Sequence, residues 1–407
     1  MKPKISFSEE QKDWIKRPLL SNIEKILDYR GRTPKKLGLS WSDTGFLALS
    51  ALNVKNGYID FNADANYGDQ ELYDRWMGDN HLHKGQVVFT TEAPMGNVAQ
   101  IPNDDLYILS QRTIAFEVKH DLIREDFLAT LLRSPKIFNE LTSLSSGGTA
   151  KGVSQKSLSN LKVCVPASLD EQSAIGSLFR TLDDLLVSYK DNLANYQSLK
   201  ATMLSKMFPK AGQKVPEIRL DGHEGEWEIK RADEIFKSVS EKNRASLPVL
   251  SASQIDGMVL RDEIGIDIKY DEATLNNYKV VKPGQFVIHL RSFQGGFALS
   301  KLEGITSPAY TVIDFIDKST NLSDFWNSIL TSRDFIKRLE TVTYGIRDGK
   351  SISFKDFSSL KFIFPEFEEQ QAIGAYFSSL DNLINSHQEK ISQLETLKKK
   401  LLQDMFI

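Results

Sequence analysis

The sequence predicts an α+β protein. It has two mixed α/β domains, two long antiparallel coiled-coil helices and an internal pseudo-twofold repeat. Apolar residues recur at steps of three and four through residues 168–209 and again through residues 366–407, as in long coiled-coil helices. The segments that precede these helices also resemble each other, about 200 residues apart. Because each helix follows one globular segment, the two apolar stripes can bury each other only if the helices are antiparallel.

Length and composition set the class of protein. The chain has 407 residues, of which 41% are hydrophobic and 26% charged, enough for two or three soluble domains. No apolar run approaches the ~18 residues of a membrane span, and no signal peptide is recognisable, so we expect a cytoplasmic protein. The single cysteine, Cys164, excludes an internal disulfide. The net charge of −3 is unlike that of most nucleic-acid-binding domains, so DNA binding has to rest on local patches.

The first globular domain is expected over residues 1–167. Residues 127–144 have a helical pattern, and the loop that follows is rich in glycine and serine, from Ser145 to Gly152. Strands are expected where β-branched and aromatic residues cluster between Gly, Pro and Asn, at residues 46–54, 85–90, 106–118 and 161–165.

The first long helix is expected over residues 168–209. It begins at a capping box formed by Ser168 and Glu171 and ends before Pro209, because proline cannot continue a helix. Spacing alone also fits two helices of an ordinary bundle, but the flanking repeat favours the coiled coil. The two stripes comprise Ile175, Phe179, Leu182, Leu186, Tyr189, Leu193, Tyr196, Leu199, Met203 and Met207, and Ile373, Phe377, Leu380, Ile384, Ile391, Leu394, Leu397, Leu401 and Met405.

The second half repeats the order of the first. A linker rich in proline and glycine is expected at residues 210–226, a second globular domain at 227–365 and the second long helix at 366–407. Trp227 takes the place of Trp14, and Pro365 takes the place of Pro166. One period of half the chain is too long for a solenoid repeat, so it indicates two copies of one unit.

No catalytic motif emerges from the sequence. Gly345-Ile346-Arg347-Asp348-Gly349-Lys350-Ser351 is one residue shorter than a phosphate-binding G-x-x-x-x-G-K-[ST] loop, so a strand-connecting loop is the favoured interpretation. His81 and His83 lie two residues apart, but no carboxylate or cysteine cluster completes a metal site. Cys164 lies in an apolar strand and is expected to be a small buried hydrophobe. The chain is therefore predicted to bind and not to catalyse.

Two stretches resemble the specificity subunit of type I restriction–modification systems. They are the helix entries Pro166…Glu171-Gln172-Ser173-Ala174-Ile175-Gly176 and Pro365…Glu369-Gln370-Gln371-Ala372-Ile373-Gly374. The linker segment Val215-Pro216-Glu217-Ile218-Arg219 resembles the entry to that family's second target-recognition domain, and Arg30-Gly31-Arg32-Thr33-Pro34-Lys35 resembles its first-domain entry. The resemblance covers nearly the whole chain. One departure is that the second helix entry has no Ser or Thr capping box.

The resemblance implies two target-recognition domains, each reading half of a bipartite double-stranded DNA site, with the helices setting the gap. It also implies two methyltransferase (modification) subunits and motor-nuclease (restriction) subunits as partners. S-adenosylmethionine and ATP with Mg²⁺ are expected on those partners, and no cofactor or metal in this chain. The alternative function is a coiled-coil scaffold that joins two protein-binding domains without DNA, which the negative net charge favours.

Candidate DNA contacts are basic and polar residues in equivalent places of the two copies. Arginine and lysine can contact phosphates or a guanine edge, and glycine-rich loops allow close approach to DNA. For each group the alternative is a solvated charge run or a plain connecting loop. The candidates are Arg30, Arg32, Lys35, Lys36, Thr91, Arg112, Thr149, Lys151, Lys242, Arg244, Arg291, Gln294, Arg347 and Lys350.

Overall fold

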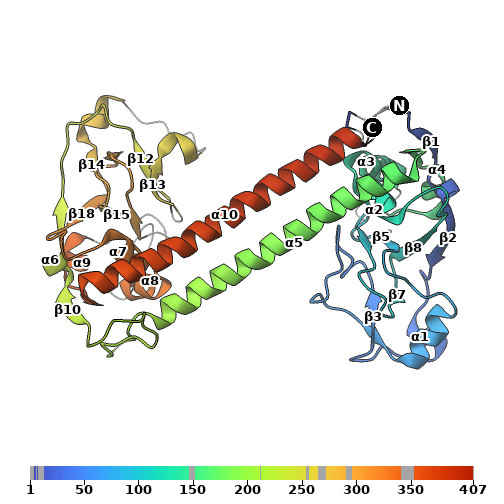
Figure 1. Cartoon of the computed structure of the whole chain (residues 1–407), viewed down its shortest axis with the longest axis horizontal. Coiled ribbons are helices and arrows are strands. Elements are labelled where there is room, and N and C mark those ends of the chain that lie inside the picture. The colour runs from blue at the N-terminus through green and yellow to red at the C-terminus, as the bar shows by residue number, and fades with distance from the viewer. Residues whose placement is uncertain are drawn as a thin grey trace. The chain divides into compact units, whose positions relative to one another are not determined.

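The computed structural model contains two compact units (Figure 1). The first is formed by Met1–Asp191 with Glu389–Ile407 and the second by Asn192–Gln388. Each unit therefore includes part of both long helices, α5 (Leu169–Lys206) and α10 (Phe367–Met405). The structure describes residues 4–5, 7, 13–145, 152–210, 212–253, 256–264, 272–289, 296–340 and 353–406.

The first unit is built on the four-stranded antiparallel sheet β2-β8-β5-β6. Its strands are β2 (Ile23–Asp28), β8 (Thr113–Val118), β5 (Val87–Thr90) and β6 (Val98–Gln100). The other elements are the pair β1 (Ile15–Pro18) with β9 (Lys162–Val165), the sheet of β4 (Tyr67–Gly68), β3 (Phe46–Leu49) and β7 (Ile108–Leu109), and the helices α1 (Gln70–Met77), α2 (Glu125–Arg133), α3 (Pro135–Leu144) and α4 (Gln155–Asn160).

Both faces of this sheet are buried. Val87 and Phe89 of β5 face a core that includes α2 and the start of α5, whereas Val88 faces a second core that includes α1 and β3. Side chains alternate between the faces of a strand, so a strand with two buried faces has a continuous apolar run instead of an alternating one. The short apolar runs Val87–Phe89 in β5 and Ile114–Phe116 in β8 reflect this double burial.

The second unit repeats the strand order of the first. Its four-stranded sheet is β11-β18-β15-β16, formed by β11 (Phe236–Val239), β18 (Thr311–Phe315), β15 (Phe286–Ile288) and β16 (Phe297–Leu299). The remaining elements are β10 (Glu228–Arg231) with β19 (Lys361–Phe364), β12 (Leu250–Ser253) with β13 (Gly257–Leu260), β14 (Lys279–Val281) with β17 (Gly304–Thr306), and the helices α6 (Ala232–Ile235), α7 (Ser323–Leu330), α8 (Arg333–Glu340) and α9 (Phe354–Ser358). The predicted fold class, with its duplicated unit, is confirmed.

Equivalent glutamines attach the long helices to their sheets. Gln172 accepts a hydrogen bond from the backbone N–H of Arg124 at 2.9 Å and donates to the carbonyls of Leu122 and Pro166. Gln370 repeats this pattern: it accepts from the Leu322 N–H and donates to the carbonyls of Thr320 and Pro365. Both glutamines are buried. The repeated Glu-Gln-x-Ala-Ile-Gly motif thus fixes each helix where it leaves its domain, since buried polar groups need such partners.

The glycines of this motif let the long helices pack closely. A Cβ at Gly176 would lie 2.4 Å from the Asp126 Cβ in α2, whereas a Cβ at Gly374 would meet nothing nearer than 3.2 Å. We expect Gly176→Ala to destabilise the protein, because an overpacking cost of about 1–3 kcal/mol outweighs the gain of about 1 kcal/mol in helix propensity. Gly374→Ala should stay within about 1 kcal/mol of the natural protein. Urea denaturation measures both, and equal stabilities would contradict this account of Gly176.

The helices run antiparallel within each unit. In the first unit Lys398 of α10 pairs with Asp183 of α5, and Glu395 pairs with Lys190 further along α5. In the second unit Lys200 of α5 pairs with Asp381 of α10. The ends of the predicted apolar stripes are buried, from Ile175 to Leu186 and from Ile373 to Ile384.

Two members of the predicted stripes are exposed, and the members between the buried ends are otherwise partly buried. Leu199 exposes 38% of its surface and Leu397 exposes 46%. The prediction of burial was wrong for them because a pair of helices covers only one narrow seam. Leu185 and Leu383 are exposed beside that seam, at 40% each.

Candidate nucleic-acid interface

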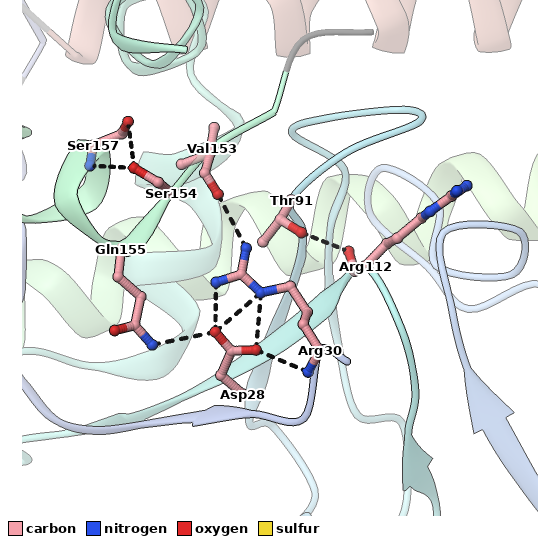
Figure 2. Close-up of polar contacts among 8 residues, drawn as sticks. All are labelled: Asp28, Arg30, Thr91, Arg112, Val153, Ser154, Gln155 and Ser157. Atoms are coloured by element: carbon pink, nitrogen blue, oxygen red, sulfur yellow. Dashed lines mark hydrogen bonds and ion pairs between the residues drawn. The ribbon is translucent and has the colours of Figure 1, made fainter. Parts of the chain in front are cut away.

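Loops at one edge of the first unit's sheet carry several predicted site residues. In the strand register Asp28 at the end of β2 lies opposite Ile114, and Thr90 at the end of β5 lies opposite Thr113. The ends of β2 and β5 and the start of β8 therefore share one edge, which we call edge 1. Figure 2 shows Arg30, Thr91 and Arg112 at this edge.

Arg30 is held by an ion pair and by a backbone carbonyl. Its guanidinium pairs with both carboxylate oxygens of Asp28, at 2.9 Å and 2.5 Å, and donates to the Val153 carbonyl at 3.3 Å. Gln155 also donates to Asp28. Burial raises the pKa of the Asp28 carboxyl, but the hydrogen bonds from Arg30 outweigh that effect and lower it. Arg30 thus ties residues 152–155 to the end of β2, and its guanidinium is already engaged.

The rest of the predicted basic run forms a compact turn. The Arg32 guanidinium lies 4.5 Å from the centre of the Tyr29 ring and donates to the Trp76 carbonyl. Lys36 Nζ donates to the Gly31 carbonyl at 2.6 Å. The Lys35 side chain is exposed and makes no hydrogen bond or ion pair among the described residues, although its backbone carbonyl accepts from the Gly38 N–H at 3.1 Å. The side chains of Arg30, Arg32 and Lys36 already donate to acceptors within the chain. Lys35 is the described cation of this run whose ammonium could bind a phosphate without giving up such a contact.

Thr91 is buried and Arg112 is exposed. The Thr91 backbone N–H donates to the Arg112 carbonyl at 2.8 Å and its hydroxyl donates to the same oxygen at 3.2 Å. Thr91 exposes 1% of its surface, which argues against a direct DNA contact by this residue. The Arg112 guanidinium forms an ion pair with Glu92, with 3.5 Å between Nε and Oε1. Thr91 therefore positions the loop from which Arg112 projects.

The second unit gathers cations at the equivalent edge. Val239 at the end of β11 lies opposite Val312, and Ile288 at the end of β15 lies opposite Thr311. Lys242 and Arg244 belong to the loop after β11, and we call this edge 2. Both side chains are exposed.

One carboxylate and one partly buried lysine accompany this loop. Glu241 pairs with Lys282 at 2.6 Å and with Arg244 at 3.8 Å, and the hydrogen bond from Lys282 lowers the pKa of the Glu241 carboxyl. Lys279 donates to the Tyr310 carbonyl at 2.6 Å. Burial, with a smaller contribution from Lys242, lowers the pKa of Lys279. Lysines therefore predominate among the cations at edge 2, whereas edge 1 combines Lys35 and Lys36 with two arginines, Arg30 and Arg112, that pair with carboxylates.

The remaining predicted site residues lie outside the described residues, and so does the motif Gly345–Ser351. They are Thr149, Lys151, Arg291, Gln294, Arg347 and Lys350.

Several pairings and residues of the two edges were not predicted from the sequence; Glu92 lies in the stretch 91–93 that was predicted as a candidate contact, but its pairing with Arg112 was not predicted. Asp28 and Glu92 hold the guanidinium groups of Arg30 and Arg112. Asp28 lies only two residues before Arg30, a signal that the pattern of cations alone overlooked. Lys279 and His289 also lie near edge 2, and burial lowers the pKa of His289. Lys279 gave no signal because contacts between distant segments bring it there, whereas His289 follows β15 directly but belongs to no recognisable motif.

The histidines and the cysteine fit structural roles. His83 Nε2 contacts Glu125 at 2.8 Å, and His81 Nδ1 contacts the Tyr73 hydroxyl at 2.7 Å. Within the described residues no group of three His, Cys, Asp or Glu side chains could hold a metal ion. Cys164 is buried, as predicted. No helix in the described part of the chain has the length and apolarity needed to span a membrane.

Comparisons with known proteins agree on one family. Residues 53–195 and 224–396 match the model of the type I restriction modification DNA specificity domain. Two similar proteins come from Methanocaldococcus jannaschii. The type I restriction enzyme MjaVIII specificity subunit is 26% identical over 319 residues, which cover 72% of each chain. The putative type I restriction enzyme MjaX specificity subunit is 23% identical over 431 residues, covering 98% of this chain and 94% of that protein.

A solved structure has the same fold. The crystal structure of the type I restriction-modification system S subunit from M. genitalium aligns with a TM-score of 0.65 at 15% sequence identity, and the alignment covers 100% of this chain and 99% of that chain. At this level of identity the similarity concerns the fold.

Proposed function

This chain belongs to the type I restriction–modification DNA specificity family, and from that premise we propose that its two units each read one half of a bipartite DNA site. The duplicated sheet carries this proposal. Each unit presents basic side chains at the same edge of the same four-stranded sheet. Cations attract phosphates whatever the sequence, whereas base edges require side chains of defined geometry. Because the two edges carry different side chains, the two half-sites should differ.

The same premise gives the proposed partners. Two modification subunits would carry S-adenosylmethionine and the methyltransferase site, and motor-nuclease subunits would use ATP and Mg²⁺. This chain would contribute specificity without a cofactor of its own. Exposed leucines support the docking of one partner twice: Leu185 and Leu397 are exposed in the first unit, and their repeat equivalents Leu383 and Leu199 in the second. Single exposed leucines are common on protein surfaces, so it is their occurrence at equivalent positions of both units that supports a docking surface used twice.

We expect Leu185→Lys to weaken the binding of one modification subunit by about 10-fold or more, because the lysine would place an unpaired charge in the contact at a cost above ~1.4 kcal/mol. Leu383→Lys should do the same for the other copy, and the double variant should lose both. The mass of the purified complex measures the stoichiometry. Val187→Asn is the matched control, because Val187 is exposed but its repeat equivalent is Asn385. Equal effects of Val187→Asn and Leu185→Lys would contradict the docking surface.

Mapping methylated bases tests the proposed function. In cells that carry the modification subunit, a bipartite methylated motif should appear only when this chain is present. The purified complex should also bind DNA with an affinity that falls steeply as salt rises. The alternative, a scaffold without DNA, predicts no motif that depends on the chain. An unchanged methylation pattern in the absence of the chain would overturn the proposal.

A further inference from the structure

Arg112 has a backbone conformation that is uncommon for arginine. Its φ of 64° lies in the left-handed region, which non-glycine residues seldom adopt outside special sites. Hydrogen bonds hold the loop in place: both Thr91 groups donate to the Arg112 carbonyl, and Gln111 Nε2 donates to the Arg32 carbonyl at 3.1 Å. The side chain points away from this network (Figure 2) and is 53% exposed. Hydrogen bonds thus hold the backbone of the loop, and the loop presents one exposed guanidinium.

The partner of Arg112 holds it only loosely. Glu92 lies at 3.5 Å and is 49% exposed, and exposed pairs of this kind contribute little to stability. The Arg30–Asp28 pair at the same edge is different, because Arg30 is engaged by two carboxylate oxygens and by the Val153 carbonyl. Arg32 is likewise engaged by Tyr29 and Trp76. Of the three arginines that the structure describes at edge 1, Arg112 is therefore the one that can turn to a ligand at small cost.

We propose that Arg112 and Glu92 form a specificity-determining pair that selects a guanine in the half-site read by the first unit. This inference rests on the proposed function. The fork of a guanidinium matches the two acceptors of guanine, O6 and N7. When Arg112 turns to guanine, Glu92 loses its ion pair at an edge that the proposed function places against the DNA. A guanine compensates for that loss with two charge-assisted hydrogen bonds. An adenine does not, since its N6 amino group is a donor, so Glu92 penalises sites without guanine.

Selection of DNA from a randomised pool tests the pair, with the complete complex of this chain and its modification subunits. Arg112→Ala should lower the affinity for the selected site by roughly 5- to 150-fold and relax the motif at one G·C position. Arg112→Lys keeps the charge and loses the fork, so binding to unrelated DNA should stay unchanged while the preference for guanine falls. Glu92→Gln should strengthen binding to all DNA. The affinity for the selected site should then exceed the affinity for unrelated DNA by a smaller factor than in the natural complex.

A matched control removes a cation elsewhere on the same strand. Lys119 follows the far end of β8, opposite to edge 1, and Lys119→Ala should leave the motif unchanged. Thermal unfolding establishes that each variant is folded. If Arg112→Ala leaves the motif intact, alters both half-sites, or abolishes binding to all DNA in a folded complex, the inference is overturned. If the natural complex selects no motif, the proposed function fails first, so the two failures are distinguishable.

Discussion

Asp183→Asn is expected to destabilise the first unit by about 3 kcal/mol. The Asp183 carboxylate is shared by Arg133 of α2, at 2.5 Å, and by Lys398 of α10. Arg133 exposes 7% of its side chain and Asp183 21%. Loss of the charge leaves the Arg133 guanidinium buried without an opposite charge, with only its hydrogen bond to the Ala129 carbonyl remaining. Such a loss costs about 3–5 kcal/mol, and the partial exposure of Asp183 favours the lower value. Urea denaturation measures the loss, and hydrogen exchange should place it in α2 and the adjoining turns of α5.

The repeat supplies the control for this prediction. Asp381 takes the equivalent position in α10, but its ion-pair partner among the described residues is Lys200, and both side chains are substantially exposed. Asp381→Asn should therefore cost no more than about 1 kcal/mol. Equal losses at the two positions would show that the buried Arg133 does not decide the effect. Arg133 has no counterpart in the second unit, because the equivalent position is Thr331.

Much of the fold could be predicted from the sequence because the same unit occurs in both halves of the chain. The repeated order of elements along the chain can be recognised from local apolar runs and turn residues alone. The apolar stripes of the helices have a regular period. The exposure of Leu199 and Leu397 could not be predicted in the same way. A heptad pattern specifies apolar side chains but not how many helices are available to cover them. Residues that a partner covers have the same pattern as residues of an intramolecular seam.

The candidate site was harder to predict than the fold. Basic residues near turns identified the loops around Arg30 and Arg112, but only the structure assigns their partners. Thr91 follows a buried strand directly, and its burial depends on Arg112, which is 21 positions away in the sequence. The partly buried Asp28 holds the Arg30 guanidinium by short hydrogen bonds, whereas the exposed Glu92 forms only a longer ion pair with Arg112. Such pairings depend on side-chain geometry, which residue type and spacing do not specify.

Exchange of the second globular domain should change one half of the recognised site. The chimera keeps residues 1–226 and 366–407 and takes residues 227–365 from another member of the family. Gln370 binds backbone groups of Thr320, Leu322 and Pro365, so a donor of the same fold can provide the same contacts. The first half-site should stay unchanged and the second should follow the donor. The gap should also stay unchanged, because α5 and α10 are retained.

The reciprocal chimera, with residues 1–167 exchanged, is the matched control and should alter only the first half-site. Its donor domain has to place backbone carbonyls where those of Leu122 and Pro166 lie, because Gln172 donates hydrogen bonds to both. Both chimeras should unfold as the natural chain does. A chimera that fails to fold indicates a mismatch at these attachment points and is replaced by one from a closer donor.

The most direct test of independent reading by the two units is the sequencing of methylated bases in two kinds of cells. One kind carries the natural complex, and the other carries the chimera with residues 227–365 exchanged. If the two units read DNA independently, the two motifs will share the first half-site and the gap and will differ throughout the second half-site. A chimera that changes both half-sites, or that changes only the gap, would contradict independent reading by the two units.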